Sequence, residues 1–345
     1  MKMPDLAPLR RLSARIGRNL DLVQAGGGNT SIKDSGTLWV KASGMWLVDA
    51  EKEDMFLPVD MGDFLRCVEE SIDYVADYGS SAGGNAGALR PSVETAMHAV
   101  LPHAVVVHVH SVNTIAWAVR LDAPACLEKV LTGLRWAWIP YVHPGLILAQ
   151  RIRDLLSQRP DVLILGNHGL VVGGQDCDSA EALLDEVERR LALPPRATLA
   201  ANPGALPELA GWQPAQYDEA HALAMDAFSI RAAAGGTMYP DHCVYLGPSV
   251  AVVALGESPE DSVKRYESQQ GVRPKVLVIP GKGVLLPADL PRAGRELLIC
   301  LKRVCERIAP QAPFGYLDAA EVARLMNWDA EKYRIQLARQ YDAQA

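Results

Sequence analysis

The sequence contains few cysteines, no apolar run of membrane-spanning length and no dense basic patch. The six cysteines are scattered without a CxxC pair, which is typical of buried free thiols in a reducing cytoplasm. Because no apolar run is long enough to cross a bilayer, we expect no membrane partner. The net charge is −7 and no basic patch offsets it, so we also expect no nucleic-acid partner.

The N-terminal segment does not resemble a targeting signal. Residues 9–20 contain four arginines, and no apolar signal core or cleavage site follows them. We therefore expect an amphipathic helix here and a cytoplasmic protein. The 345 residues, of which 49% are hydrophobic and 22% charged, are ordinary for a soluble globular protein and long enough for two lobes.

Three histidines and one glutamate form the most informative pattern in the chain. His108 and His110 follow an apolar run and lie two residues apart, so on a strand both side chains point to the same face. His168 follows a second apolar run, in a turn that contains glycine. Three imidazoles with an open fourth position are typical of a catalytic site for zinc or a similar metal. Glu94 could ligate the resting metal or act as an acid/base.

A His-x-His pattern alone more often marks strand histidines that are merely packed or exposed. Here further motifs surround it, and in chain order they are 26–33 (GGGNTSIK), 40–44 (VKASG), 91–98 (PSVETAMH), 108–111 (HVHS) and 167–171 (NHGLV). Together they resemble the class II aldolase/adducin N-terminal family over roughly residues 9 to 192. Its members include fuculose- and rhamnulose-phosphate aldolases and ribulose-phosphate 4-epimerase.

The resemblance implies an α/β/α fold with a central mixed or antiparallel sheet. It also implies a divalent ion, zinc first, with manganese, iron or cobalt as alternatives, bound by His108, His110 and His168. Glu94 would then move the substrate proton. This agrees with elementary chemistry, because a metal stabilises the enediolate left by cleavage of a carbon–carbon bond beside a ketone, and a nearby carboxylate moves the proton. No Schiff-base lysine is needed.

Small and hydroxyl-bearing residues suggest how an anionic substrate is held. A glycine-rich turn offers backbone N–H groups that can surround an anion without steric conflict. In the family the matching positions hold the substrate phosphate, which here are Asn29, Thr30, Ser43, Gly44 and Ser92. Ordinary turns and caps are the alternative interpretation of the same residues.

One position departs from the family pattern. Sugar-phosphate aldolases of this family usually have two serines before the glutamate, whereas Val93 follows Ser92 here. The presumed phosphate pocket therefore has one hydroxyl fewer. A non-phosphorylated or carboxylate-bearing substrate is an alternative.

Three further histidines have open interpretations. His98 lies four residues after Glu94 on a helix that we expect to start at Pro91, and it either orients Glu94 or is a partly buried helix histidine. His103 is expected in a turn, with no assigned role. His143 belongs either to a loop near the site or to an apolar connection.

The composition divides the chain into two lobes and a linker. Residues 193–214 are rich in proline, alanine and glycine and form the predicted linker. Residues 1–192 form the predicted metal-binding domain, and 215–345 a smaller α/β C-terminal lobe, the extension beyond the family domain. We expect helices at 179–191, 218–234 and, as an amphipathic helix, 319–340.

The second lobe contains a degenerate copy of part of the first, or a similar unit that common fold rules produced. Residues 162–172 and 276–286 both predict strand, glycine turn and strand, followed by a helix, with Lys282 where the first copy has His168. Lys282 could bind a carboxylate or phosphate, or be a solvated turn residue. Asp241 and His242 could line a substrate site or cap a turn.

These observations lead to one main hypothesis and two alternatives. The main one is a metal-dependent aldolase, an aldehyde-lyase of carbohydrate metabolism that acts on a small sugar phosphate or hydroxy-keto acid. An epimerase or decarboxylase-like relative would use the same four residues. A non-catalytic, adducin-like interaction protein is the third possibility. Family resemblance implies a homo-oligomer, with a tetramer as the expected form.

Overall fold

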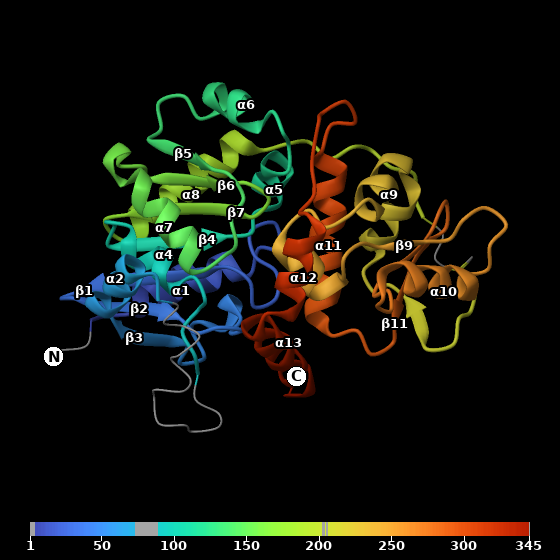
Figure 1. Ribbon diagram of the computed structural model, residues 1–345, viewed down its shortest axis with the longest axis horizontal. Coiled ribbons are helices and arrows are strands. Elements are labelled where there is room, and N and C mark those ends of the chain that lie inside the picture. The colour runs from blue at the N-terminus through green and yellow to red at the C-terminus, as the bar shows by residue number, and fades with distance from the viewer. Residues whose placement is uncertain (1–3, 73–88, 202–203, 205, 345) are drawn as a thin grey trace. The chain divides into compact units, whose positions relative to one another are not determined.

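The computed structural model describes residues 4–72, 89–201, 204 and 206–344. The chain divides into two compact units, which are described separately (Figure 1). The first unit comprises residues 1–114 and 123–192, and the second comprises 115–122 and 193–345. The short segment 115–122 belongs to the second unit. Its sequence contains no linker-like stretch that would predict this assignment.

The first unit is built on a seven-stranded sheet with the strand order β3-β2-β1-β4-β7-β6-β5. Neighbouring strands are antiparallel except β5 and β6, which are parallel. The predicted central mixed sheet is therefore confirmed. The strands are β1 (Asn29–Asp34), β2 (Thr37–Lys41), β3 (Phe56–Asp60), β4 (Val105–Val109), β5 (Trp136–Ile139), β6 (Val162–Leu165) and β7 (Gly169–Gly174).

Helices cover both faces of this sheet, which gives the predicted α/β/α layers (Figure 1). On one face lie α2 (Met61–Glu70), α4 (Thr95–Val100) and α7 (Leu146–Leu155), and on the other α1 (Ala7–Gly17) and α8 (Cys177–Leu191). All residues of β4, β6 and β7 are buried, as expected for apolar strands covered on both sides. The shorter helices of this unit are η1 (Leu47–Asp49), α6 (Ala123–Val130) and η2 (Leu156–Gln158). Helix α5 (Val112–Ala118) begins in the first unit, and its residues from Ile115 onward are assigned to the second.

The helix expected to start at Pro91 begins only at Thr95, so that prediction was wrong by one turn. Pro91 instead forms an isolated antiparallel bridge with Ala42, next to the end of β2. The carbonyl of Ser92 then accepts hydrogen bonds from the backbone N–H and the hydroxyl of Thr95, at 3.0 and 2.7 Å. Glu94 therefore occupies the position that precedes the first helical turn.

The second unit contains a four-stranded sheet with the order β8-β11-β10-β9. The edge strand β8 lies at the end of the predicted linker, so the linker interpretation was wrong for these residues. Pro214 lacks a backbone N–H, and an edge strand is where a sheet tolerates such a residue. The strands are β8 (Trp212–Pro214), β9 (Ala251–Val252), β10 (Leu277–Ile279) and β11 (Gly283–Pro287).

Two helices predicted as continuous in this unit are each broken once. The break at Asp226 arises because its extended backbone lets the carboxylate accept from the N–H groups of Phe228 and Ser229 and start a new helix. The other break is at Trp328. The helices are η4 (Asp218–Met225), α9 (Ala227–Ala234), the π-helix η5 (His242–Leu246), α10 (Pro259–Gln270), α11 (Arg292–Arg307), α12 (Ala319–Asn327) and α13 (Asp329–Gln344).

The two segments compared as a repeat share their turn geometry. Leu165 pairs with Gly169 across the turn of the first unit, and Ile279 pairs with Gly283 in the second. The N–H of His168 donates to Leu165 at 3.1 Å, and the N–H of Lys282 donates to Ile279 at 3.0 Å. Lys282 thus occupies the turn position of His168, while common descent of the two units stays a hypothesis.

All six cysteines are free thiols. Within the described part of the chain, none of the helices is both long and apolar enough to span a membrane.

Candidate metal centre

Strand β4 presents the first two histidines of the site. His108 pairs directly with Asn29 of β1, so these two side chains lie on the same face of the sheet. His110 follows the last residue of β4, and its imidazole Nε2 lies 3.1 Å from that of His108. The alternation of the strand therefore brings both imidazoles together.

The third histidine is placed by the turn between β6 and β7. Asn167 adopts the left-handed conformation with φ of 50°, which asparagine tolerates better than most residues. After this reversal the chain passes very close to β4, because a Cβ on Gly169 would lie only 2.5 Å from the carbonyl oxygen of Val109. Glycine at this position lets His168 approach His108 and His110.

Glu94 completes a compact, buried group. Its Oε2 lies 3.3 Å from Nε2 of His108, and its Oε1 lies 3.4 Å from Nε2 of His168. The potential ligand atoms of Glu94, His108, His110 and His168 all lie within 4.8 Å of one another. All four residues are at most 6% exposed. Among the residues that the structure describes, no other group of His, Cys, Asp and Glu has this arrangement.

The donor atoms of this group fit a divalent metal ion. Nδ1 of His108 lies 3.0 Å from the carbonyl oxygen of Leu170, which can only accept, so Nδ1 carries the proton and Nε2 faces the cluster with its lone pair. A hydrogen bond of this kind commonly orients histidines that ligate metals. In addition, Oε1 of Glu94 accepts no hydrogen bond from the described residues. A cation would satisfy these inward-facing atoms.

Electrostatics favour the ionised form of Glu94. Burial by itself would raise the pKa of this carboxyl group, but the positive charge that His108, His168 and His110 carry when protonated and a hydrogen bond from Asn29 lower it to about 2. A buried carboxylate beside three imidazoles is available either as a ligand or as a proton acceptor.

The family model for the class II aldolase and adducin N-terminal domain matches residues 10–193, which is more than half of the chain. The chain belongs to this family. The resemblance inferred from the five motifs is therefore confirmed, and the second unit lies almost entirely beyond the family domain.

Several proteins are similar to the family domain of this chain. The uncharacterized oxidoreductase YuxG of Bacillus subtilis (strain 168) is 29% identical over 182 residues, which are 48% of this chain and 26% of that protein. The chain thus spans about a quarter of the length of this curated relative. The N-terminal class II aldolase domain of a conserved protein from Thermoplasma acidophilum is 28% identical with a TM-score of 0.48, and the match covers 55% of this chain and 94% of that one. L-fuculose-1-phosphate aldolase from Thermus thermophilus is 17% identical with a TM-score of 0.37, covering 54% and 92%.

In this aldolase-family site, the ring of His98 is linked to the carboxylate of Glu94 through the side chain of Asn29. The amide nitrogen of Asn29 donates to Oε2 of Glu94 at 2.8 Å, and the amide oxygen accepts from Nε2 of His98. Burial lowers the pKa of His98 to about 3, so the ring is neutral and its Nδ1 accepts from the hydroxyl of Ser31 at 2.7 Å. The sequence could only suggest that His98 orients Glu94 or is a buried helix histidine.

The segments expected to hold an anion lie against each other. A Cβ on Gly26 would lie 2.8 Å from the carbonyl oxygen of Gly44, so the glycine-rich turn and the 40–44 motif are in backbone contact. Lys41 links them as well, since its buried ammonium group donates to the carbonyls of Gly26 and Met45, at 2.9 and 2.7 Å. Sequence reasoning assigned Lys41 no role, although a lysine in an otherwise apolar strand was a signal for one.

The remaining residues expected to bind substrate differ in their surroundings. The hydroxyl of Ser92 lies 3.2 Å from the amide nitrogen of Asn29, beside the cluster. Ser43 is buried, and its backbone N–H donates to the carbonyl of Arg90 at 2.7 Å. Thr30 is the exception, because strand alternation turns its side chain to the other face of β1, where the hydroxyl lies 2.7 Å from that of Ser13. The structure does not bring the Thr30 side chain to the group.

The other two histidines of this unit are separate from the metal-binding group. His103 is buried, and its Nε2 lies 2.9 Å from Oδ1 of Asp161. His143 is also buried, in the connection between β5 and α7. Neither is among the four clustered side chains.

Proposed function

We propose that this protein is a metal-dependent carbon–carbon lyase of the aldolase type. The observation that carries the proposal is the buried group of Glu94, His108, His110 and His168, whose ligand atoms lie within 4.8 Å of one another. Three imidazole ligands suit zinc first, with manganese, iron and cobalt as alternatives. Membership of the class II aldolase and adducin family supports this reaction class.

Each residue of the group has its own role in the proposed reaction. His108, His110 and His168 hold the ion, which when bound supplies a Lewis acid for the substrate carbonyl oxygen. Glu94 is ionised and has one oxygen without a hydrogen bond from the described residues, so it can take the substrate proton on Oε1. Asn29 holds the other carboxylate oxygen and thereby fixes the direction in which Glu94 accepts.

The proposed contacts for an anionic group of the substrate are Asn29, Ser43, Gly44 and Ser92. Thr30 is omitted because its side chain lies on the opposite face of β1. The substrate class is a small sugar phosphate or a hydroxy-keto acid. Val93 in place of a second serine leaves one hydroxyl fewer for a phosphate, which favours assays that include keto acids from the start.

Metal content is the first test. Wild-type protein purified without chelator should contain about one divalent ion per chain by mass spectrometry, and His108→Ala/His110→Ala should have lost it. The unfolding curve of the variant verifies that it folds. A wild type that contains no metal, even after zinc or manganese is supplied, would overturn the lyase mechanism and favour an interaction protein.

The second test separates proton transfer from metal binding. Glu94→Gln should retain most of the metal on the three histidines and lose activity by about 10²–10⁴-fold, the usual contribution of a positioned acid/base group. Glu70→Gln, which changes an exposed glutamate of α2 in the same unit, is the control and should be nearly unchanged. Product analysis identifies the reaction, since aldol cleavage lowers the carbon count and epimerisation retains it.

A further inference from the structure

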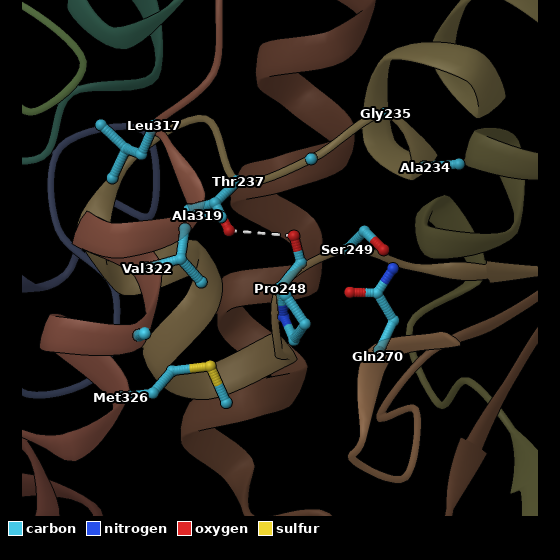
Figure 2. A pocket seen from close by; sticks show the side chains of 12 residues that line it. Ala234, Gly235, Thr237, Pro248, Ser249, Gln270, Leu317, Ala319, Val322 and Met326 are labelled. Atoms are coloured by element: carbon cyan, nitrogen blue, oxygen red, sulfur yellow. Dashed lines mark hydrogen bonds between the residues drawn. The ribbon is translucent and has the colours of Figure 1, made fainter. Parts of the chain in front are cut away.

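Two cavities in the second unit differ in chemistry. The first, of about 360 Å³, lies beside α12 and the 235–237 turn, with Val322 and Met326 on one side (Figure 2). Its polar side chains are neutral, and the hydroxyl of Thr237 already donates to the carbonyl of Pro248 at 2.9 Å. Because no charged side chain lines this cavity, it specifies no ligand class.

The second cavity, of about 190 Å³, is lined by charged residues as well as apolar ones. Its walls come from η5, from residues 273–275 before β10, from residues 287–294 around the start of α11, and from α13. Its charged residues are Arg273, Lys275, Arg339 and Asp289. Three cations thus face one carboxylate, in a chain whose net charge is −7.

The three cations lack anionic partners within the described part of the chain. Lys275 donates to the carbonyl oxygen of Val244 at 3.1 Å, and Arg273 lies over the ring of Trp212 at 5.4 Å, but neither they nor Arg339 forms an ion pair with a described carboxylate. Burial lowers the pKa of Lys275, while Cys243 raises it and the nearby guanidinium of Arg339 lowers it. Three cations around a cavity that holds only one carboxylate create a positive potential that attracts an anion.

The wall formed by α13 is held by a buried ion pair. Nη1 of Arg334 lies 3.1 Å from Oδ1 of Asp241 and 2.8 Å from Oε2 of Glu331, and its guanidinium lies 5.7 Å from the ring centre of Tyr245. Asp342 also accepts from the first N–H of α11, that of Arg292, at 2.6 Å. These contacts fix Tyr245 and α13, which line the cavity, so its shape exists before any ligand binds.

We propose that this cavity is a binding site for a small phosphomonoester. A phosphomonoester carries a charge close to −2 at neutral pH, which matches the excess of two positive charges in the lining. Arginine and lysine are the usual phosphate ligands, and the walls formed by Val244, Leu290 and Ile335 offer apolar contact to the carbon part of such a ligand. All lining residues belong to the second unit, so the site is additional to the proposed lyase centre.

The test is a calorimetric titration of the full-length protein with phenyl phosphate, repeated with inorganic phosphate. We expect saturable binding that is tighter for phenyl phosphate, because its ring contacts the apolar walls. Arg339→Gln and Lys275→Met should each weaken this binding about tenfold, the loss expected for one charge-assisted hydrogen bond. The control is Arg324→Gln, which changes another exposed arginine, on α12, that does not line the cavity, and it should bind as the wild type does.

Hydrogen exchange then distinguishes this cavity from the anion-binding segments of the first unit. Bound phenyl phosphate should slow exchange in residues 273–276 and in α13. Slower exchange confined to residues 26–30 would place the ligand at the proposed lyase centre and overturn the proposal. Equal affinities of Arg339→Gln and Arg324→Gln, or no binding by the wild type, would overturn it as well. None of these outcomes depends on lyase activity.

Discussion

His98 determines the orientation of the side-chain amide of Asn29. Its ring donates from Nε2 to the amide oxygen, so the amide nitrogen points to Glu94, 2.8 Å from Oε2. The position of the proposed proton-transfer group therefore depends on a histidine ring that is linked to the carboxylate through Asn29. All three side chains are buried, which makes each unpaired polar atom costly.

Replacement of His98 should affect both stability and turnover. His98→Leu leaves the hydroxyl of Ser31 and the amide oxygen of Asn29 without this partner, so we expect a loss of about 2–3 kcal/mol in the free energy of unfolding. Turnover should fall more than metal content, because Asn29 can then rotate away from Glu94. Urea unfolding and metal analysis measure the two effects.

The conservative change His98→Gln provides the control, since glutamine retains a donor for Asn29. It should recover part of the lost turnover. Equal turnover in His98→Leu and the wild type would show that the amide of Asn29 needs no support from His98.

Gly169 should be intolerant of even one methyl group. A Cβ there would lie 2.5 Å from the carbonyl oxygen of Val109, so β4 and β7 must separate locally. We expect Gly169→Ala to lower the free energy of unfolding by about 1–3 kcal/mol and to reduce metal affinity, since His168 is the preceding residue. Thermal unfolding and metal titration test this. Gly62→Ala in α2 is the control and should retain full metal content. Full metal content in Gly169→Ala would show that the close approach of Gly169 to Val109 is unimportant for the site.

The buried charges around Arg334 should matter for the stability of the second unit. Arg334→Met leaves Asp241 and Glu331 as buried carboxylates without their cation, and we expect a loss of about 3–5 kcal/mol. The triple change Arg334→Met/Asp241→Asn/Glu331→Gln removes all three charges and should recover much of that loss. Chemical denaturation measures both variants, with Arg324→Met as the exposed control. Failure of the triple variant to recover stability would assign the effect to lost packing.

Asp226 should make stability depend on pH in the acid range. Burial alone would raise its pKa, but hydrogen bonds from Ser229 and Arg196 lower it from about 3.8 to about 2. Because the folded-state pKa lies below the unfolded value, this stabilisation is present above pH 3.8 and is lost as the pH falls to about 2. At pH 7 the wild type should exceed Asp226→Asn by about 1–2 kcal/mol.

Urea unfolding at a series of pH values measures that difference. It should shrink steadily below pH 3.8 and be mostly lost at about pH 2. Asp329→Asn changes a side chain that is 94% exposed and serves as the control. A difference that is constant down to pH 2 would assign the effect of Asp226→Asn to lost helix capping instead of lost charge.

Local patterns predicted the parts of the structure that depend on neighbours in the sequence. The alternation of His108 and His110 and the turn at His168 follow from strand and hairpin geometry. By contrast, the start of α4 at Thr95 depends on the bridge between Pro91 and Ala42, which are far apart in the chain. Thr30 was wrongly expected at the site for a similar reason. Which face of β1 its side chain occupies depends on how β1 pairs with β4, and the sequence does not show this pairing.

The sequence by itself determined the family and the α/β class, because motifs in a set order and apolar periodicity are encoded locally. Only the tertiary structure decided that Asn29 connects His98 with Glu94, that Lys41 joins two backbone turns, and that Arg334 pairs with Asp241. Each of these contacts joins residues from different elements. Their formation depends on how helices and strands pack, and this information is spread over the whole chain.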